Sequence, residues 1–174
     1  TAILKAVSYE NKCKIYYVLI CYLLRKDSSK EAQLVKKLLK KHNINLFVLK
    51  NKKTIDKNVQ SQARKIRYDL LIEFCKKKGI STILTAHNLE DQVETFFIRL
   101  SRGSGLHGLS SMKEISKLEK KITLVRPLLD FKKIQLIEIS KSVFGKFYKD
   151  PSNSNTKYLR TRIRGLKTIL EEKG

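Results

Sequence analysis

Apolar runs alternate with amphipathic segments along the first hundred residues, and this alternation constrains the fold more than any other feature. The apolar runs are rich in β-branched and aromatic residues, as buried strands are, and they lie at 15–24, 44–49 and 80–86. Segments with helical spacing follow each of them, beginning near residues 28, 57 and 89. A chain that repeats strand and helix in this order predicts an α/β fold, a Rossmann-like parallel sheet flanked by helices.

Turn and cap residues predict where several helices begin and end. Ser28 and Glu31 have the spacing of a capping box, and Gly79 ends a long helix over 57–78. Farther along, a short strand is expected at 122–125, followed by a helix over about 132–144 that Asp130 caps. A last helix, rich in basic residues, is expected over about 157–172. The sequence shows no internal repeat and no long linker.

The charge of the chain points to a polyanionic partner. Lysine and arginine together number 38 against 16 acidic residues, which gives a formal net charge of +22. A balance this basic favours binding to RNA or DNA, although phosphate contacts alone read no sequence. The alternative is a lysine-rich composition from biased codon usage, with most lysines on solvated helix faces. Hydrophobic residues make up 41% of the chain, enough for a packed core and too many for a disordered basic tail.

The cysteines and the hydropathy indicate the cellular compartment in which the protein is expected. The chain has three cysteines, Cys13, Cys21 and Cys75, an odd number with no CxxC pair. This usage argues against a disulfide framework and a cysteine metal site, and it favours a reducing cytoplasm. The longest apolar run, 15–24, is too short to cross a membrane. We therefore expect a cytoplasmic protein without membrane attachment, whose oligomeric state the sequence leaves open.

The densest group of polar residues follows the third expected strand. His87, Asp91 and Glu94 are spaced four and three apart, which places them on one face of the helix expected over 89–100. In open α/β sheets, ligands bind beyond the carboxyl ends of the strands. Two carboxylates in the first turns of a helix can hold Mg²⁺ or bind an ammonium group. The alternative for such a triplet is a solvated polar face.

Arginines and glycines supply three further candidate contacts. Arg102, Gly103 and Gly105 lie in a loop whose backbone amides can approach an anion closely. Two arginines three apart on the long helix can hold a nucleotide phosphate, and three more in the last helix suit the backbone of a nucleic acid. Each group also has a plain interpretation as flexible loop or basic solvent face. The arginines of the long helix are Arg64 and Arg67, and those of the last helix are Arg160, Arg162 and Arg164.

Several short motifs, taken in order, resemble the tRNA(Ile)-lysidine synthases, which belong to the PP-loop ATP pyrophosphatases. They are LRKDSSKEA (24–32), ARKIRY (63–68), HNLEDQVET (87–95), RLSRGSGLHGL (99–109), VRPLL (125–129), DPSN (150–153) and RTRIR (160–164). Any one of them is weak evidence. Their common order across nearly the whole chain makes the resemblance specific.

The resemblance implies a function and a role for each matching residue. Such enzymes bind ATP and Mg²⁺, adenylate the wobble cytidine of a minor isoleucine tRNA, and let free L-lysine displace AMP. Asp91 and Glu94 would then serve the lysine and the metal, with Arg64 as a further catalytic group. His87, Arg67 and the loop residues would face ATP, the loop residues being Arg102, Gly103 and Gly105. The last helix would contact tRNA(Ile) through Arg160, Arg162 and Arg164.

The chain also departs from the family pattern. No SGGxDS phosphate loop occurs, and residues 1–4 resemble the helix that follows it, so the first strand and the loop are expected outside this chain. Where the family has an Asp-His pair before Leu-Arg, this chain has Cys21-Tyr22-Leu23. We expect residues 1–128 to form a nucleotide-binding α/β domain that lacks those parts, and 129–174 to be a helical extension of it.

These departures leave three functions open. The first is a lysidine-forming ligase whose phosphate loop is supplied elsewhere. The second is an inactive truncated remnant with residual tRNA binding, because a chain without the loop should lack ATP-dependent lysine transfer. The third is a tRNA 2-thiolation enzyme, which the absence of a CxxC pair disfavours.

Overall fold

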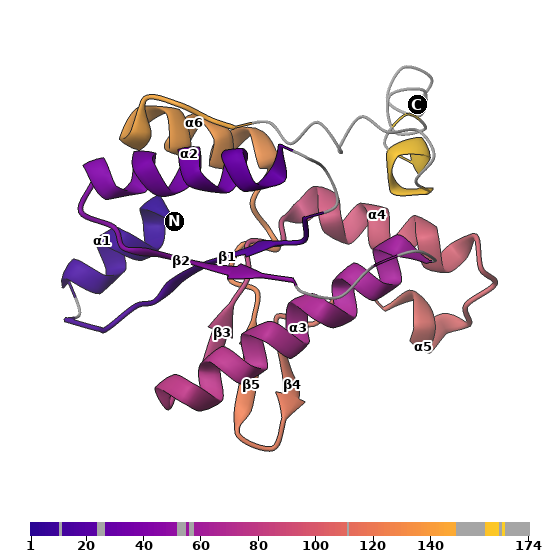
Figure 1. Cartoon of the computed structure of the whole chain (residues 1–174). Helices are drawn as coiled ribbons and strands as arrows, with labels where there is room; N and C mark the ends of the chain where they lie inside the picture. Colours follow the sequence, from indigo (N-terminus) through magenta and orange to yellow (C-terminus); the bar gives the residue numbers. More distant parts are fainter. Residues whose placement is uncertain are drawn as a thin grey trace. The chain divides into compact units, whose positions relative to one another are not determined.

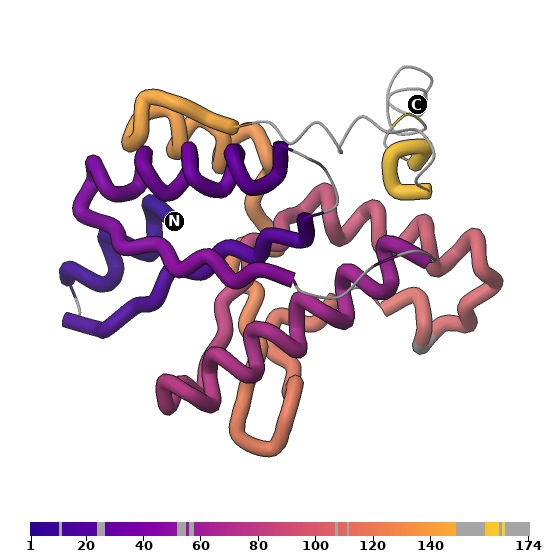
Figure 2. The backbone as a smooth tube through the Cα atoms, viewed as in Figure 1, coloured from indigo at the N-terminus to yellow at the C-terminus, as the bar shows by residue number. Residues whose placement is uncertain are grey.

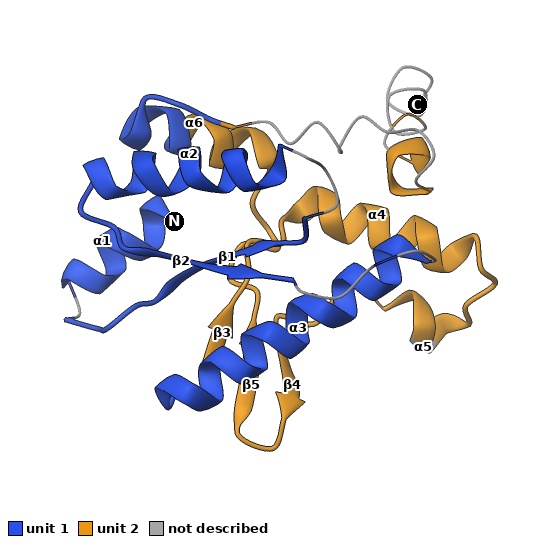
Figure 3. Cartoon of the chain, in the orientation of Figure 1, with its two compact units in different colours: residues 1–81, 139–147 blue, residues 82–138, 148–174 orange. Residues whose placement is uncertain are grey.

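A computed structural model describes residues 1–10, 12–23, 27–51, 55, 58–110, 112–148, 159–163 and 165. They form two compact units, shown in different colours in Figure 3. The first unit contains residues 1–81 and 139–147, and the second contains 82–138 and 148–174. Each unit is therefore built from segments that are distant in the sequence. The division expected at residue 128 follows the order of the chain instead, and it stays a prediction.

The first unit has helices packed on a small parallel sheet (Figure 1). Its strands, β1 (Tyr17–Cys21) and β2 (Leu46–Lys50), pair in parallel with Tyr17 opposite Leu46. Its helices are α1 (Ala2–Glu10), α2 (Ser28–Lys41), α3 (Val59–Lys78) and the part of α6 (Lys133–Phe144) that follows residue 138. Parallel strands need a crossover connection, and α2 provides it between β1 and β2.

The core of the first unit joins α2, β2 and the end of α6. Leu39, Ile44, Leu46 and Phe144 form one buried cluster. Phe144 also meets the ring of His42 edge-on, with 5.0 Å between the ring centroids. These contacts fix the C-terminal end of α6 against α2, although about ninety residues of sequence separate the two helices.

The second unit contains a three-stranded sheet, with helices following its first strand (Figures 1 and 2). Its strands are β3 (Thr82–Leu84), β4 (Ile115–Glu119) and β5 (Ile122–Val125), in the order β3-β5-β4. β3 runs parallel to β5, and β4 runs antiparallel to it. The helices α4 (Leu89–Leu100) and α5 (Leu106–Leu109) follow β3. Leu124 at the centre of β5 has no exposed surface, which marks the middle of this core.

The main elements agree with the prediction from sequence. The α/β class with parallel strands flanked by helices is confirmed, and the helix expected at 89–100 has those bounds. Gly79 ends α3 with a φ of +66°, a conformation that glycine adopts without strain. Residues 159–163 and 165 are helical, as expected of the last basic segment, whose remaining residues lie outside the described part of the chain.

Other expectations were wrong. β4 was not predicted, because its only apolar residues, Ile115 and Leu118, are separated by two polar ones and Ile115 is 61% exposed, so neither an apolar run nor an alternating pattern marks the strand. The N-cap of α2 is Asp27 rather than Ser28, and its side chain makes no capping hydrogen bond. Asp130 does not cap α6, which begins at Lys133, and the side chain of Gln135 accepts a hydrogen bond from the N–H of Lys132 instead.

Candidate functional site

Buried polar side chains mark the candidate site, because a polar group taken out of water must be paired or put to use. Among the described residues, five polar or charged side chains are buried. One of them, Asn51, follows β2 in the first unit. The other four belong to the second unit, where they follow β3, lie on α4 or follow β5: His87, Asn88, Glu94 and Arg126.

Two polar residues, Thr85 and Arg126, meet at the carboxyl ends of β3 and β5. The N–H of Thr85 donates to the carbonyl of Val125 at 3.0 Å, which continues the parallel pairing by one residue beyond Leu84. Because side chains alternate along a strand, Thr85 and Arg126 lie on the same face as the buried Ile83 and Leu124. The apolar row of the core thus ends in two polar residues at the edge where α/β proteins bind ligands.

Arg126 is held by backbone and hydroxyl oxygens. Its Nη1 donates to the carbonyl of Lys113 at 2.6 Å and to Oγ of Ser116 at 3.1 Å. Its Nε is buried and has no hydrogen-bond partner in the described part of the chain. Arg126 therefore joins the end of β5 to the start of β4 and brings a positive charge into the interior of the unit.

His87 follows β3 and is 9% exposed. Its Nδ1 lies 2.9 Å from Oγ1 of Thr85. A hydrogen bond at Nδ1 fixes the orientation of the ring, as in sites where histidine binds a ligand or moves a proton. The structure therefore places His87 at the end of the strand, where the sequence put it, within a buried polar group.

Asp91 takes part in the capping box of α4. The side chain of Asn88 accepts a hydrogen bond from the N–H of Asp91, and the Asp91 carboxylate accepts one from the N–H of Asn88, both at 3.1 Å. This reciprocal pair satisfies two of the N–H groups that a helix leaves open at its beginning. Asp91 is half-buried, so it serves the helix and also lies at the positive end of the helix dipole.

Glu94 is the more deeply buried carboxylate, with 4% of its surface exposed. It lies three residues after Asp91 and so on the same face of α4. A solvated polar face therefore does not describe Glu94. A buried carboxylate next to a half-buried one suits a cationic ligand, either an ammonium group or a metal ion. In the described residues, no group of three or more His, Cys, Asp and Glu side chains has the arrangement of a metal site.

The loop after α4 is attached to that helix at several points. Gln92 accepts a hydrogen bond from the N–H of Met112 at 2.7 Å and donates one to its carbonyl at 3.0 Å. Nη1 of Arg99 donates to the carbonyl of Gly108 at 3.0 Å and also to that of Ser110. The sequence suggested a flexible loop as one interpretation, but these bonds tie Gly108, Ser110 and Met112 of the loop to α4.

Within this loop, the three predicted anion contacts are exposed. Gly103 has a φ of +67°, a conformation that glycine adopts without strain, and Gly105 is the N-cap of α5. Arg102 lies in the turn before them. Their role toward a nucleotide stays a prediction.

Arg64 and Arg67 lie on α3 in the first unit, and the structure gives them different surroundings. Arg64 is exposed, and its guanidinium lies 5.2 Å from the ring centroid of Tyr68. Arg67 is half-buried, and its Nε donates to the hydroxyl of Tyr22 at 2.6 Å. The two arginines thus share a helix but not an environment, and their relation to Asp91 and Glu94, which belong to the other unit, stays a prediction.

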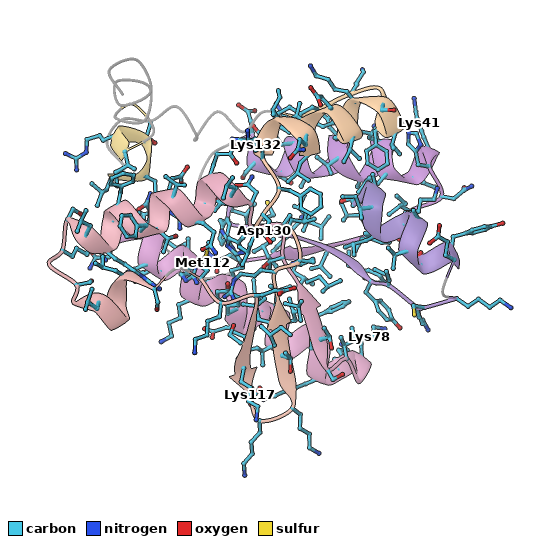
Figure 4. All side chains as sticks on the ribbon, turned by 180° about the vertical axis from the view of Figure 1, so that it is seen from behind. Lys41, Lys78, Met112, Lys117, Asp130 and Lys132 are labelled. Carbon is cyan, nitrogen blue, oxygen red and sulfur yellow. The ribbon has the colours of Figure 1, made fainter. Side chains whose placement is uncertain are left out.

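Basic residues are spread over both units. Lys41 ends α2, Lys78 ends α3 and Lys117 lies in β4 (labelled in Figure 4), and all three are exposed. In the last helix Arg160 is half-buried and Arg162 is exposed, whereas Arg164 lies outside the described residues. Net charge alone therefore does not locate a tRNA surface, and the proposed contacts at 160–164 stay a prediction.

Sequence reasoning missed several polar residues of these groups. Arg126 lies within the VRPLL motif, but its burial was not expected because it follows an apolar strand. Tyr22 was noted only as a departure from the family pattern. Asn88 signals its role in the sequence, since asparagine three residues before aspartate is a capping pattern. Thr85 and Asn51 carry no such signal: both follow strands, and only the fold shows their contacts.

The sequence of the whole site lies within one family model, which matches residues 1–171 and describes a PP-loop domain. The chain belongs to the PP-loop domain family. This PP-loop domain is also similar to curated tRNA(Ile)-lysidine synthases. It is 43% identical to that of Wolbachia pipientis over 145 residues and 38% identical to that of Orientia tsutsugamushi over 158 residues. The resemblance inferred from the motifs is confirmed.

The matches cover most of this chain but only a minor part of each relative. The matches include 82% and 89% of this PP-loop domain but only 33% and 35% of the two relatives, so the chain spans about a third of their length. A solved structure, a U34-tRNA thiolase from Methanococcus maripaludis with its iron–sulfur cluster, matches 99% of the chain and 62% of its own. Its TM-score of 0.74 at 13% identity shows a shared fold. In the described residues, no helix has both the length and the apolar character needed to span a membrane.

Proposed function

We propose that this PP-loop domain is the nucleotide-binding part of a tRNA(Ile)-lysidine synthase. The observation that carries the proposal is its 41–43% identity to two such enzymes over 82% of the chain. The buried Glu94 and the capping Asp91 support it, because both lie in the HNLEDQVET segment on which the resemblance rests. The reaction is an ATP-dependent ligation of lysine to the wobble cytidine of a minor isoleucine tRNA.

The proposed chemistry has two steps. The 2-carbonyl oxygen of the cytidine attacks the α-phosphate of ATP, and pyrophosphate leaves. The ε-amine of L-lysine then attacks C2, and AMP leaves. In this proposal Asp91 and Glu94 bind the ammonium group of lysine, and Arg64 and Arg67 offset the negative charge of the phosphates. His87 and the loop from Arg102 to Gly105 contact the nucleotide.

Mg²⁺ belongs to the proposal as a companion of ATP. This ion is usually held by one or two carboxylates together with the phosphates of the substrate. Asp91 and Glu94 fit that need, since both are carboxylates on one helix face and neither is fully exposed. The bound ion would offset phosphate charge, and the two carboxylates would orient it.

Two further functions compete with this one. A thiolation enzyme is disfavoured, because Cys21 and Cys75 are buried, Cys13 is exposed and the sequence has no CxxC pair. An inactive chain that only binds tRNA remains the second hypothesis, which the sequence raises through its lack of SGGxDS. A cytoplasmic setting, where tRNA is modified, is part of the proposal and accords with the odd number of cysteines and the lack of a CxxC pair.

The test is lysidine formation. The native gene product that contains these residues is incubated with ATP, Mg²⁺, radiolabelled lysine and tRNA(Ile), and the tRNA is analysed by mass spectrometry for lysidine. We expect label in tRNA(Ile) and none in tRNA(Met) controls. Residues 1–174 alone are expected to show no turnover. Sulfur in place of lysine at the anticodon would favour the thiolation function, and no modification by the native product would favour the inactive one.

A further inference from the structure

Tyr22 and Arg67 form a close pair at the carboxyl end of β1. The Nε of Arg67 donates to the Tyr22 hydroxyl at 2.6 Å, a short distance for an N–H···O bond. The guanidinium carbon also lies 5.8 Å from the centroid of the Tyr22 ring. One residue thus holds the arginine in two ways, through the hydroxyl and through the ring.

The backbone of Tyr22 is itself anchored. Asn51, 5% exposed, follows β2, and its N–H donates to the carbonyl of Cys21 at 2.9 Å. Its side-chain amide lies 3.5 Å from the carbonyl of Tyr22. The residue that holds Arg67 therefore stands on the end of the β1–β2 sheet and not on a free loop, so its hydroxyl has a defined place.

The hydrogen bond at Nε of Arg67 leaves the two Nη groups of the guanidinium to bind a ligand. Arginine has five N–H donors, and the Nη1 and Nη2 groups form the fork that binds phosphate or carboxylate in parallel. For Arg67 no hydrogen bond from either Nη is present among the described residues. Arg64, one turn earlier, has no such hydroxyl contact and lies exposed over the ring of Tyr68. The two arginines of the ARKIRY motif are therefore not equivalent.

We propose that Tyr22 is a positioning residue that orients Arg67 so that its two Nη groups bind an anionic oxygen of the nucleotide. The identity of the ligand rests on the function proposed above, whereas the pair itself rests on the geometry of the first unit. Tyr22 stands where the resemblance led us to expect an Asp-His pair. At this position, where the chain departs from the family pattern, the hydroxyl of Tyr22 makes a contact with Arg67.

The experiment compares Tyr22→Phe with Tyr68→Phe. Each variant removes one phenolic oxygen and keeps the ring, but the hydroxyl of Tyr68 is buried and has no partner in the described residues. The Nε–Hε resonance of Arg67, assigned with Arg67→Lys, is followed by NMR, and the dissociation constant for Mg·ATP is measured on the full chain. We expect Tyr22→Phe to shift that resonance, to speed its exchange with water and to weaken ATP binding about tenfold, at an unchanged melting temperature.

The control and a rescue variant sharpen the result. Tyr68→Phe is expected to leave the resonance and the ATP affinity unchanged, and Tyr22→His, which keeps an acceptor on a ring, should recover part of the affinity. An Arg67 resonance that is the same in Tyr22→Phe, or one that ATP and pyrophosphate leave unmoved in the parent chain, overturns the proposal. The lysidine assay is independent of these measurements, so either proposal can fail alone.

Discussion

Asn88 and Asp91 cap one another across the first turn of α4, each side chain accepting a hydrogen bond from the backbone N–H of the other at 3.1 Å. The same aspartate is the one that the resemblance assigns to lysine and metal. A single side chain thus carries a structural task that can be measured and a catalytic task that is proposed. The two can be separated by substitution.

Asp91→Asn keeps an oxygen that can accept from the N–H of Asn88 but removes the negative charge. We expect the free energy of unfolding to change by a few tenths of a kcal/mol, while lysidine formation by the native product is lost. Asp91→Ala removes both functions and should cost about 1 kcal/mol as well. Denaturant unfolding and the labelled-lysine assay separate these effects. Full activity in a stable Asp91→Asn protein would show that the carboxylate acts only as a cap.

Glu94→Gln is expected to raise KM for lysine at least tenfold and to leave tRNA affinity unchanged, because a buried neutral amide attracts an ammonium group less than a carboxylate does. Glu90 offers a matched control on the same helix. Its Oε2 accepts a hydrogen bond from the N–H of Lys133 at 2.8 Å, at the start of α6. Glu90→Gln should therefore leave KM for lysine unaltered. Equal effects of the two substitutions would contradict a ligand role for Glu94.

Arg126→Met tests the buried arginine between β5 and β4. The substitution removes the bonds to Lys113 and Ser116, and we expect a loss of about 1–3 kcal/mol in the free energy of unfolding. Amide hydrogens of β4 should also exchange faster. Ser116→Ala removes only one acceptor, so it should cost less. A variant as stable as the parent would mean that the buried charge costs as much as its hydrogen bonds contribute.

Burial raises the pKa of the Cys75 thiol. Below about pH 8.5, the ordinary pKa of a thiol, folded and unfolded chains both keep the proton. Above that pH the unfolded chain releases it first, so the free energy of unfolding falls as the pH rises. Urea midpoints measured from pH 7 to pH 10 should show this decline, and Cys75→Ala should reduce it. A decline that is the same in the variant would assign it to other groups.

Salt tests the tRNA contacts expected in the last helix. Each phosphate that the protein neutralises contributes a slope of about 0.7–0.9 to the plot of log affinity against log salt. Replacing Arg160 and Arg162 with glutamine should lower the slope by up to about 1.8 for duplex-like contacts. The same change at Lys77 and Lys78, which end α3, is the matched comparison. Equal losses at the two places would mean that charge, and not the last helix, governs binding.

Strong periodic signals explain why most of the fold could be predicted. The apolar runs near β1, β2 and β3 and the glycine that ends α3 leave few alternatives. β4 was not predicted because only Ile115 and Leu118 of its residues are apolar, their spacing is not that of a strand, and Ile115 is largely exposed. Its stability comes from pairing with β5 and from the Arg126 bond, neither of which leaves a pattern in the sequence of the strand itself.

The residues of the candidate site could be predicted where they lie close together in the sequence. His87, Asp91 and Glu94 lie within one helix start, so their spacing was enough to group them. Tyr22 and Arg67 are 45 residues apart, and Thr85 and Arg126 are 41 apart. Such pairs depend on strand register and helix packing, which single-sequence patterns do not specify.

The bonds from Gln92 to Met112 and from Arg99 to Gly108 couple the loop mechanically to α4. Any ligand that pulls this loop toward itself also pulls on the helix that holds Glu94. A displacement of the loop would then also displace the carboxylate. Loosening the attachment, for example at Arg99, would uncouple them without touching a group that meets the substrate.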